Sequence, residues 1–207
     1  MEYLKLFREL GDTMKFLNSG FYQTINTISN FFLLSLLWLL MCLPVLTIFP
    51  ATAGMFAVVR EWLTKKNTHL FSLFFRYFKE NFKQSLFLSF IWALCLVILI
   101  VDFMFTKQLP PTMKLLFLMI LFIAGTLFTF TSIFLFPVMV QYNSNVTRLI
   151  KASFLLSIGN FPLTLLCMVI LGLIISAAFF YPISIFLSIS VGAYTIYAIC
   201  NRAFHKV

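Results

Sequence analysis

Charged residues are scarce in this chain, and most of the few that it has are basic. Lys, Arg, Asp and Glu make up 10% of its 207 residues, and the formal net charge is +9; ordinary soluble domains are about 25% charged. Two histidines are too few for a histidine-rich metal site, and the four cysteines show no CxxC spacing. We therefore predict no metal and no cofactor.

The motifs that accompany catalysis are also missing. The sequence contains no phosphate-binding glycine loop, no GxSxG, no HExxH and no paired carboxylates, and no polar region is long enough for a catalytic domain. Asp102 is the only acidic residue within an expected span, and a lone carboxylate cannot serve as both acid and base. We therefore expect a protein that is not an enzyme.

Long apolar runs are what this sequence has in abundance. Hydrophobic residues make up 62% of the chain, and several runs reach or approach the ~20 residues that a helix needs to cross a bilayer. The runs lack the two-residue alternation of a membrane β-barrel, so the sequence predicts an all-α, polytopic transmembrane helix bundle. Lys and Arg lie in the gaps between the runs, where they attract anionic lipid headgroups. We expect the lipid bilayer as a partner and no nucleic acid.

Two prolines interrupt the first long apolar run. Pro44 and Pro50 both lie within residues 31–59, and proline removes a backbone donor and breaks or kinks a helix. Residues 30–45 form the first expected span, and residues 51–63 form a second segment that is short for a bilayer. We assign structural roles to these two prolines and to Pro137, where a later run is expected to end.

The distribution of basic residues indicates how the chain crosses the membrane at this break. If the break only kinks one span, the chain has five spans, with ten Lys and Arg on one side and five on the other. If the chain turns back, it has six membrane segments, and 13 of the 15 Lys and Arg lie on one side. The positive-inside rule favours six segments, the second of them short, with both termini in the cytoplasm.

The whole chain, 1–207, is expected to form a single integral membrane domain. Residues 1–29 form an interfacial N-terminal arm, residues 30–63 a proline-broken helical hairpin, residues 64–83 a basic amphipathic helix and residues 84–207 four further spans. These spans are expected at 84–105, 112–136, 161–180 and 183–200, with a weaker amphipathic helix at 146–158. Gly159 and Asn160 are a helix-stop signal, and Pro162 suits the first turn of the next helix.

Residues 70–83 form the clearest amphipathic helix. Leu70 shares one face with phenylalanines at 71, 74, 75, 78 and 82, and the opposite face is basic. Arg76 and Glu80, four residues apart, can pair. We expect this helix to lie in the membrane interface with its aromatic face among the acyl chains; the same surface suits a docking helix for a transporter subunit. The residues assigned to this partner or lipid surface are Phe74, Arg76, Phe78, Lys79 and Lys83.

A pocket at the proline break is one hypothesis for a binding site. Thr47 and Thr52 can line a small polar site together with freed backbone groups, because broken helices near the bilayer midplane are typical of transporters. The other interpretation is a hairpin turn in which these threonines cap the freed backbone. Asp102 either belongs to a functional site or pairs with Lys107 at the interface. The candidate binding residues are Thr47, Thr52, Arg60, Glu61, Glu80, Asn81, Gln84 and Asp102.

Two groups of residues resemble the YesL-like family of bacterial membrane proteins. They are Leu43-Pro44-Val45, Thr47, Pro50, Ala51 and Thr52 with Phe75-Arg76 and Glu80-Asn81-Phe82-Lys83-Gln84, and then Phe136-Pro137 with Tyr142. Phe49 stands where this family usually has a glycine. The resemblance covers nearly the whole chain and implies a multi-pass plasma-membrane protein, mainly of Gram-positive bacteria. It also implies an association with carbohydrate-uptake systems, without an established biochemical activity.

Two functional hypotheses follow. The first is a non-enzymatic accessory or regulatory protein of a carbohydrate-uptake system in the bacterial cell membrane, acting through contacts with transporter subunits. The sugar connection is implied only by the family resemblance. The alternative is a small solute transporter or channel that uses the broken first hairpin. The sequence carries no signal for an oligomeric state.

Overall fold

The described part of the chain is helical. The computed structural model describes residues 24–64, 70–142, 145–181 and 185–204. Its helices are Thr24–Met41, the short 3-10 helix η1 (Val45–Thr47), α2 (Ile48–Thr64), α3 (Leu70–Thr106), α4 (Pro111–Gln141), α5 (Val146–Gly159), α6 (Phe161–Phe180) and α7 (Ile185–Phe204). The all-α prediction is confirmed for these residues, whereas most of the N-terminal arm expected at 1–29 lies outside them.

The chain turns back on itself after the first helix. The Trp38 indole Nε1 donates a hydrogen bond to Thr52 Oγ1 over 3.1 Å, and the ring centroids of Phe31 and Trp62 lie 5.3 Å apart. Trp38, near the end of the first helix, therefore meets the start of α2, and Phe31 meets the end of α2. The two helices run antiparallel, as a hairpin at the proline break requires and as a simple kink does not.

The break lies earlier in the chain than the two prolines suggested. The first helix ends at Met41, and Pro44 lies in the turn before η1. Pro50 lies in the first turn of α2, where proline is tolerated because an N–H there has no intrahelical partner. The first helix therefore ends at residue 41 instead of the expected 45, and the second covers 48–64 instead of 51–63.

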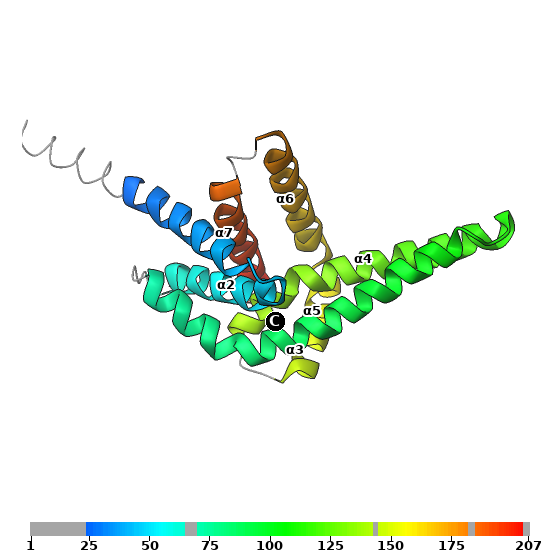
Figure 1. The fold of residues 1–207 in the computed structure, drawn as a ribbon, viewed down its shortest axis with the longest axis horizontal. Helices are drawn as coiled ribbons and strands as arrows, with labels where there is room; N and C mark the ends of the chain where they lie inside the picture. The colour runs from blue at the N-terminus through cyan, green and yellow to red at the C-terminus, as the bar shows by residue number, and fades with distance from the viewer. Residues whose placement is uncertain (1–23, 65–69, 143–144, 182–184, 205–207) are drawn as a thin grey trace, which may run out of the picture.

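The other helices pack around α2. Ten of its 17 residues are buried, and it contacts the first helix, α3, α4 and α7. Figure 1 shows it between the first helix, α7 and the start of α3. Small residues such as Ala53 and Gly54 let a neighbouring helix approach closely, and a Cβ added at Gly54 would stand 3.5 Å from the Phe74 ring. The close contact between α2 and α3 therefore leaves no room for a large side chain at position 54.

α3 contains the predicted amphipathic segment and the following span in one helix. It has 37 residues and is about 55 Å long at 1.5 Å per residue. Its first part has three sides rather than the two that the sequence predicted. A buried side faces α2, an aromatic side is partly exposed, and a basic side is exposed. The buried residues are Leu70, Leu73, Phe74 and Tyr77; the aromatic side holds Phe71, Phe75, Phe78 and Phe82; the basic side holds Arg76, Lys79 and Lys83.

Phe74 is therefore not on the lipid or partner surface to which the sequence assigned it. Its side chain is fully buried and lies against Gly54 of α2. The helical period correctly grouped the aromatic residues, but it could not show that α2 covers one edge of the group. Phe78 is half-buried, whereas Phe71 and Phe75 are exposed.

α3 and α4 form a long antiparallel arm. Trp92 Nε1 donates to Ser132 Oγ over 2.8 Å, and the Trp92 and Phe128 rings stack with centroids 5.5 Å apart. In Figure 1 the arm extends well beyond the other helices. Its outer half carries exposed apolar side chains on both helices, including Leu94, Phe105 and Phe122, as expected for helices surrounded by lipid.

The sequence predicted that this helix ends at Pro137, but α4 continues to Gln141. The neighbouring Phe136 packs against Phe49 and Phe56 of α2, with ring centroids 5.4 and 5.9 Å away. Proline is tolerated inside membrane helices where neighbouring helices hold the chain. The contacts of Phe136 therefore account for a helix that passes through this proline.

The C-terminal helices pack back onto the first hairpin. α5 ends at Gly159 and α6 begins at Phe161 with Pro162 in its first turn, as predicted. The Thr164 hydroxyl donates to the Ser157 carbonyl over 2.8 Å at this junction. The buried hydroxyls of Ser35 in the first helix and Ser190 in α7 lie 2.5 Å apart, so α7 completes the bundle around α2.

Four described helices are long and apolar enough to cross a membrane. They are Thr24–Met41, α3, Met113–Gln141 within α4, and α6. At 17 residues, α2 is too short to be counted with them, and α7 is not among them either. The chain thus has the helices of a membrane protein, while the count of six membrane segments stays a prediction.

Replacing Gly54 with leucine should destabilise the fold. The leucine side chain would collide with the buried Phe74 ring, and overpacking of this kind costs about 1–3 kcal/mol of unfolding free energy. The matched control is Gly125→Leu in α4, because a Cβ at Gly125 meets nothing within 4 Å. We expect thermal unfolding in detergent to show a lower midpoint for Gly54→Leu alone. Equal midpoints for the two variants would contradict the described contact between α2 and α3.

Candidate functional site

The two threonines of the proline break are engaged with the backbone. Thr47 Oγ1 lies 2.5 Å from the Met41 carbonyl and 2.6 Å from the Pro44 carbonyl. Thr52 Oγ1 donates to the Ile48 carbonyl over 2.7 Å. Carbonyls at the C-terminal end of a helix lack an intrahelical partner and need another donor, so Thr47 caps the end of the first helix. The Thr52 bond is the ordinary return of a hydroxyl to the carbonyl four residues earlier in the same helix. The Thr47 geometry corresponds to the capped hairpin turn, the alternative to a polar pocket at this point.

A buried polar cluster lies near the other end of α2, centred on Glu61. Only 2% of Glu61 is exposed, and its Oε1 accepts a hydrogen bond from the Tyr77 hydroxyl of α3. Arg60 Nη2 lies 4.0 Å from the same carboxylate oxygen. A buried carboxylate requires partners of this kind, because burying an unpaired charge is costly. The cluster therefore ties the end of α2 to α3.

Arg60 extends the cluster to α4. Its Nη1 donates a hydrogen bond to the Val140 carbonyl, one of the last carbonyls of α4, which have no intrahelical partner. The next residue, Gln141, accepts a hydrogen bond from the Tyr197 hydroxyl of α7 over 2.9 Å. One layer of polar contacts therefore joins α2, α3, α4 and α7.

The side chains of Arg60 and Arg76 both lie near the ring of Tyr77. The Arg76 and Arg60 guanidinium carbons lie 4.7 and 5.7 Å from the centre of its ring, and Arg76 Nη2 donates to its hydroxyl over 3.1 Å. Cations placed within about 6 Å of an aromatic ring are attracted by its quadrupole. The sequence reasoning assigned no role to Tyr77. The signal that could have identified it is its position on the side of α3 that is buried against α2, because a buried tyrosine hydroxyl usually finds a polar partner.

The outer part of the cluster reaches the surface. Arg76 Nε lies 3.9 Å from Glu80 Oε1, and the two side chains are 54% and 56% exposed. The predicted pairing four residues apart is confirmed, although exposed pairs contribute little stability. Lys79 and Lys83 are also exposed on this side of α3. Together with Arg76 they form what we call the basic face.

The remaining predicted binding residues do not converge on one site. Asn81 Nδ2 donates to the Tyr77 carbonyl over 3.0 Å within α3, and Gln84 is half-buried further along this helix. Asp102 lies 25 residues beyond Tyr77, which corresponds to about 37 Å along the helix axis. The expected ion pair of Asp102 with Lys107, both in the described part, is not formed; the Lys107 ammonium lies 4.6 Å from the centre of the Phe103 ring instead.

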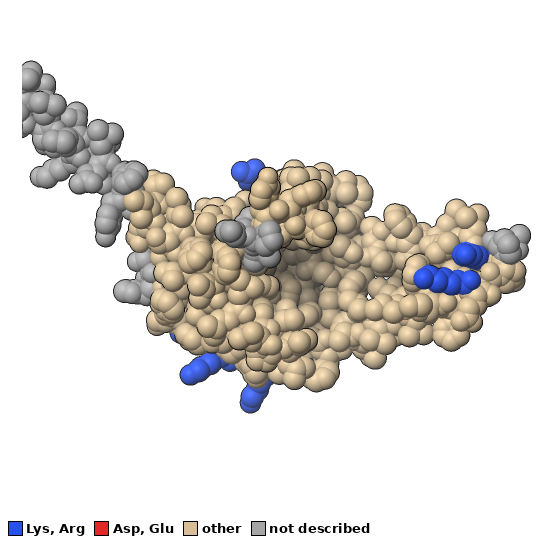
Figure 2. All heavy atoms as spheres, turned by 45° about the horizontal axis from the view of Figure 1, so that its top comes forward, with Lys and Arg blue, Asp and Glu red and all other residues tan. Residues whose placement is uncertain are grey.

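Figure 2 shows how charge is distributed over one side of the molecule. The blue Lys and Arg side chains visible there lie at the upper edge, at the lower edge and near the right-hand end, and a broad uncharged surface separates them. This arrangement is the one expected for a protein whose middle faces hydrocarbon and whose ends face the headgroups and water.

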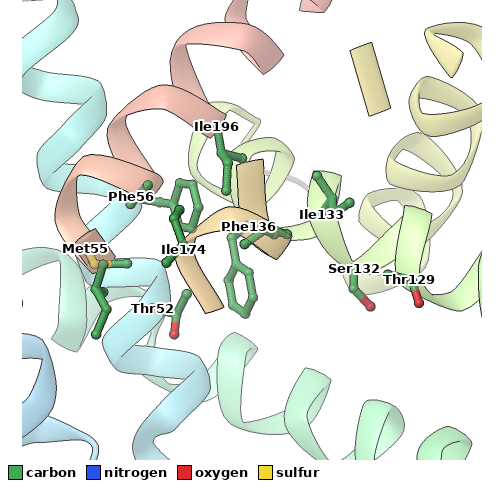
Figure 3. A pocket seen from close by; sticks show the side chains of 13 residues that line it. Thr52, Met55, Phe56, Thr129, Ser132, Ile133, Phe136, Ile174 and Ile196 are labelled. Atoms are coloured by element: carbon green, nitrogen blue, oxygen red, sulfur yellow. The ribbon is translucent and has the colours of Figure 1, made fainter. Parts of the chain in front are cut away.

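A cavity of about 310 Å³ lies between α2, α4, α6 and α7. Its walls are apolar apart from the hydroxyls of Thr52, Thr129 and Ser132, which Figure 3 shows with Phe136 and Ile196. Thr52 is the one predicted binding residue that lines this cavity. The cavity itself could not be predicted from the sequence, because its walls come from four helices far apart along the chain.

The segment that carries Arg60, Glu61 and Tyr77 matches a known protein family. Residues 31–103, which include most of the first hairpin and most of α3, match the family described as "Protein of unknown function, DUF624". The chain is also 31% identical over 175 residues to the uncharacterized protein YteU of Bacillus subtilis (strain 168). These 175 residues are 81% of this chain and 77% of YteU. The chain belongs to the DUF624 family.

Two further proteins of the same organism resemble this DUF624 chain. The uncharacterized protein YesL is 33% identical over 139 residues, which is 64% of each chain. The uncharacterized protein YesV is 29% identical over 138 residues, 65% of this chain and 66% of YesV. The chain thus spans just under two thirds of YesL and of YesV. No solved structure matches it. The YesL-like resemblance is confirmed, and the family description assigns no activity.

The hydroxyl of Tyr77 should contribute measurably to stability. Tyr77→Phe removes a donor to the buried Glu61 carboxylate, and we expect the free energy of unfolding to fall by about 1–3 kcal/mol. The control is Tyr142→Phe, because Tyr142 is exposed. Thermal unfolding of the purified variants in detergent measures both effects.

A double-variant cycle separates the pair from general packing. Glu61→Gln replaces the buried charge with a neutral amide, so the loss caused by Tyr77→Phe should be smaller in the Glu61→Gln background. Additive losses in the cycle, or equal losses for Tyr77→Phe and Tyr142→Phe, would contradict the described hydrogen bond.

Proposed function

We propose that this protein is a non-enzymatic, multi-pass protein of the bacterial plasma membrane that serves as an accessory or regulatory component of a carbohydrate-uptake system. It acts by contacting a transporter subunit. The sugar connection rests on the resemblance to the YesL-like family alone. The mode of action rests on the arrangement of α3.

The observation that carries this proposal is the basic face on the first part of α3. Arg76, Lys79 and Lys83 are exposed along one side of the helix, while its opposite side is buried against α2. The Tyr77–Glu61 hydrogen bond holds this part of α3 in place. A fixed row of cations offers an acidic partner surface a rigid complement, and such complementarity favours specific association.

The aromatic side of α3 lies next to the basic face. Phe71 and Phe75 are exposed there, and the ring centroids of Phe78 and Phe82 lie 5.5 Å apart. An interfacial helix places aromatic side chains among acyl chains and cations among headgroups. Anchoring at the membrane surface and docking of a partner are compatible on this helix, because the two functions use different sides of it.

Transport of a polar solute through the broken hairpin receives less support. The hydroxyls of Thr47 and Thr52 donate to backbone carbonyls, and the cavity beside Thr52 has apolar walls. A sugar in such a cavity would lose hydrogen bonds to water without gaining equivalent partners. The geometry therefore favours the accessory function over a transporter.

Cysteine labelling tests the orientation assumed by this proposal. In a cysteine-free background, Lys5→Cys and Lys79→Cys should react with a membrane-impermeant maleimide only after the cells are permeabilised. Lys107→Cys, at the opposite end of α3, should react in intact cells. This outcome follows from both termini and the basic face lying in the cytoplasm. Labelling of position 5 from outside, with position 79 protected, would contradict the six-segment arrangement.

Charge reversal on the basic face tests the accessory function. Lys79→Glu combined with Lys83→Glu should abolish co-purification of a transporter subunit from membranes solubilised in a gentle detergent, because the acidic partner surface would then be repelled. Mass spectrometry identifies and quantifies the partner. Arg76 is left unchanged because it contacts Tyr77 and Glu80 within the protein.

The control for charge reversal is Lys114→Glu. This residue begins the α4 side of the arm, at the end opposite to the basic face. Partner recovery should match the wild-type level in this variant. Loss of the partner in both variants, or in neither, would contradict docking through the basic face.

A further inference from the structure

The cavity between α2, α4, α6 and α7 is lined almost entirely by hydrocarbon. Met55 of α2, Ile133 of α4 and Ala193 of α7 line it, and each is at most 6% exposed. Ile174 of α6 lines it too and lies over Gly192 of α7, where an added Cβ would stand 2.3 Å from the Ile174 methyl carbon Cδ1. An apolar cavity of this kind favours an apolar occupant, because water would find too few polar partners in it.

The hydroxyl groups in the walls are already engaged. Thr52 accepts from Trp38 and donates to the Ile48 carbonyl. Ser132 accepts from Trp92 over 2.8 Å and donates to the Phe128 carbonyl over 2.7 Å. The Thr129 hydroxyl donates to the Gly125 carbonyl over 2.9 Å. Since each hydroxyl proton is used, the walls have no hydroxyl donor left for a polar ligand.

The surroundings of the cavity indicate which apolar occupant it takes. Its walls come from four helices of a chain that has several helices long and apolar enough to cross a bilayer. A bilayer supplies flexible, unbranched hydrocarbon chains that can occupy a space of about 310 Å³.

A cation lies one helical turn beyond the cavity. On α2, Arg60 follows the cavity-lining Phe56, and on α4 the Val140 carbonyl that it binds follows the cavity-lining Phe136. Arg60 binds the Val140 carbonyl and lies beside Glu61, and its side chain is still 26% exposed, so part of it is accessible to a ligand. Basic side chains between membrane helices on the cytoplasmic side bind anionic headgroups. The cavity and Arg60 therefore complement an amphiphile that has a hydrocarbon chain and a negative head.

We propose that this cavity binds one acyl chain of an anionic membrane phospholipid, whose headgroup lies beside Arg60. Met55, Ile133 and Ala193 contact the chain, and the guanidinium of Arg60 attracts the phosphate. This lipid site does not depend on the accessory function, because a lipid contact and a partner contact are measured separately.

Photo-crosslinking tests the lipid site. The full chain is reconstituted in vesicles that contain a small fraction of phosphatidylglycerol with a diazirine in one acyl chain, and labelled residues are mapped by mass spectrometry. We expect labelling at Met55, Ile133 and Ala193, which are nearly inaccessible from outside. Parallel vesicles carry the same label on phosphatidylcholine or as a free fatty acid. Phosphatidylglycerol should label about fivefold more than phosphatidylcholine, the factor that corresponds to about 1 kcal/mol per basic side chain.

Variants that fill the cavity provide the decisive comparison. Ala193→Phe should abolish labelling of Met55, whereas Val191→Phe, at a site on α7 that is 40% exposed, should not change it. If Ala193→Phe fails to fold, Ile133→Phe fills the cavity from the opposite wall. Arg60→Gln should remove the preference for phosphatidylglycerol and retain labelling of Met55.

Several labelling patterns would contradict this lipid site. Labelling confined to exposed residues such as Phe122, or labelling of Met55 that persists in the filled variants, would overturn the cavity as a lipid site. Labelling by the free fatty acid alone would exclude a phospholipid. Equal labelling by the two phospholipids would overturn the role of Arg60.

Discussion

The burial of one carboxylate constrains how the helices of this protein meet. Glu61 is enclosed in an apolar bundle, and a charge in such surroundings must be met by donors. Tyr77 supplies one from α3, and Arg60 lies beside it while also binding the end of α4. The Tyr77 donor therefore reaches the carboxylate only when α3 lies correctly against α2, and Arg60 adds a contact with α4. Apolar packing alone is not directional, so this cluster adds specificity to the contacts around α2.

The environment of α2 explains how so short a helix persists in a membrane protein. Its 17 residues span about 26 Å, less than the ~30 Å hydrocarbon layer. The first helix, α3, α4 and α7 surround it, and irregular or short segments are tolerated at membrane depth when protein encloses them. The preceding turn has its carbonyls capped by Thr47. The exposed apolar side chains lie instead on α6 and on the long arm of α3 and α4.

The sequence predicted local features well and tertiary ones poorly. Proline spacing and basic residues predicted the hairpin, and Gly159, Asn160 and Pro162 predicted the junction of α5 and α6. Helical periodicity grouped the phenylalanines of α3, but only the neighbouring Gly54 shows that Phe74 belongs to the core. Proline rules predicted the wrong end for α4, because they omit the contacts that hold Phe136. The Tyr77–Glu61 pair and the cavity both require helices that are brought together only by folding.

The length of α3 couples the protein to the thickness of its membrane. The apolar part of this helix is continuous with the segment that is fixed to α2, and no proline or glycine interrupts it. A helix whose hydrophobic length differs from that of the bilayer adjusts by tilting, kinking or deforming the lipid. Because α3 has no built-in hinge, tilting of its outer part is transmitted to the segment that bears Tyr77. A change in the tilt of the arm is therefore expected to act on the hydrogen bond between Tyr77 and the buried carboxylate.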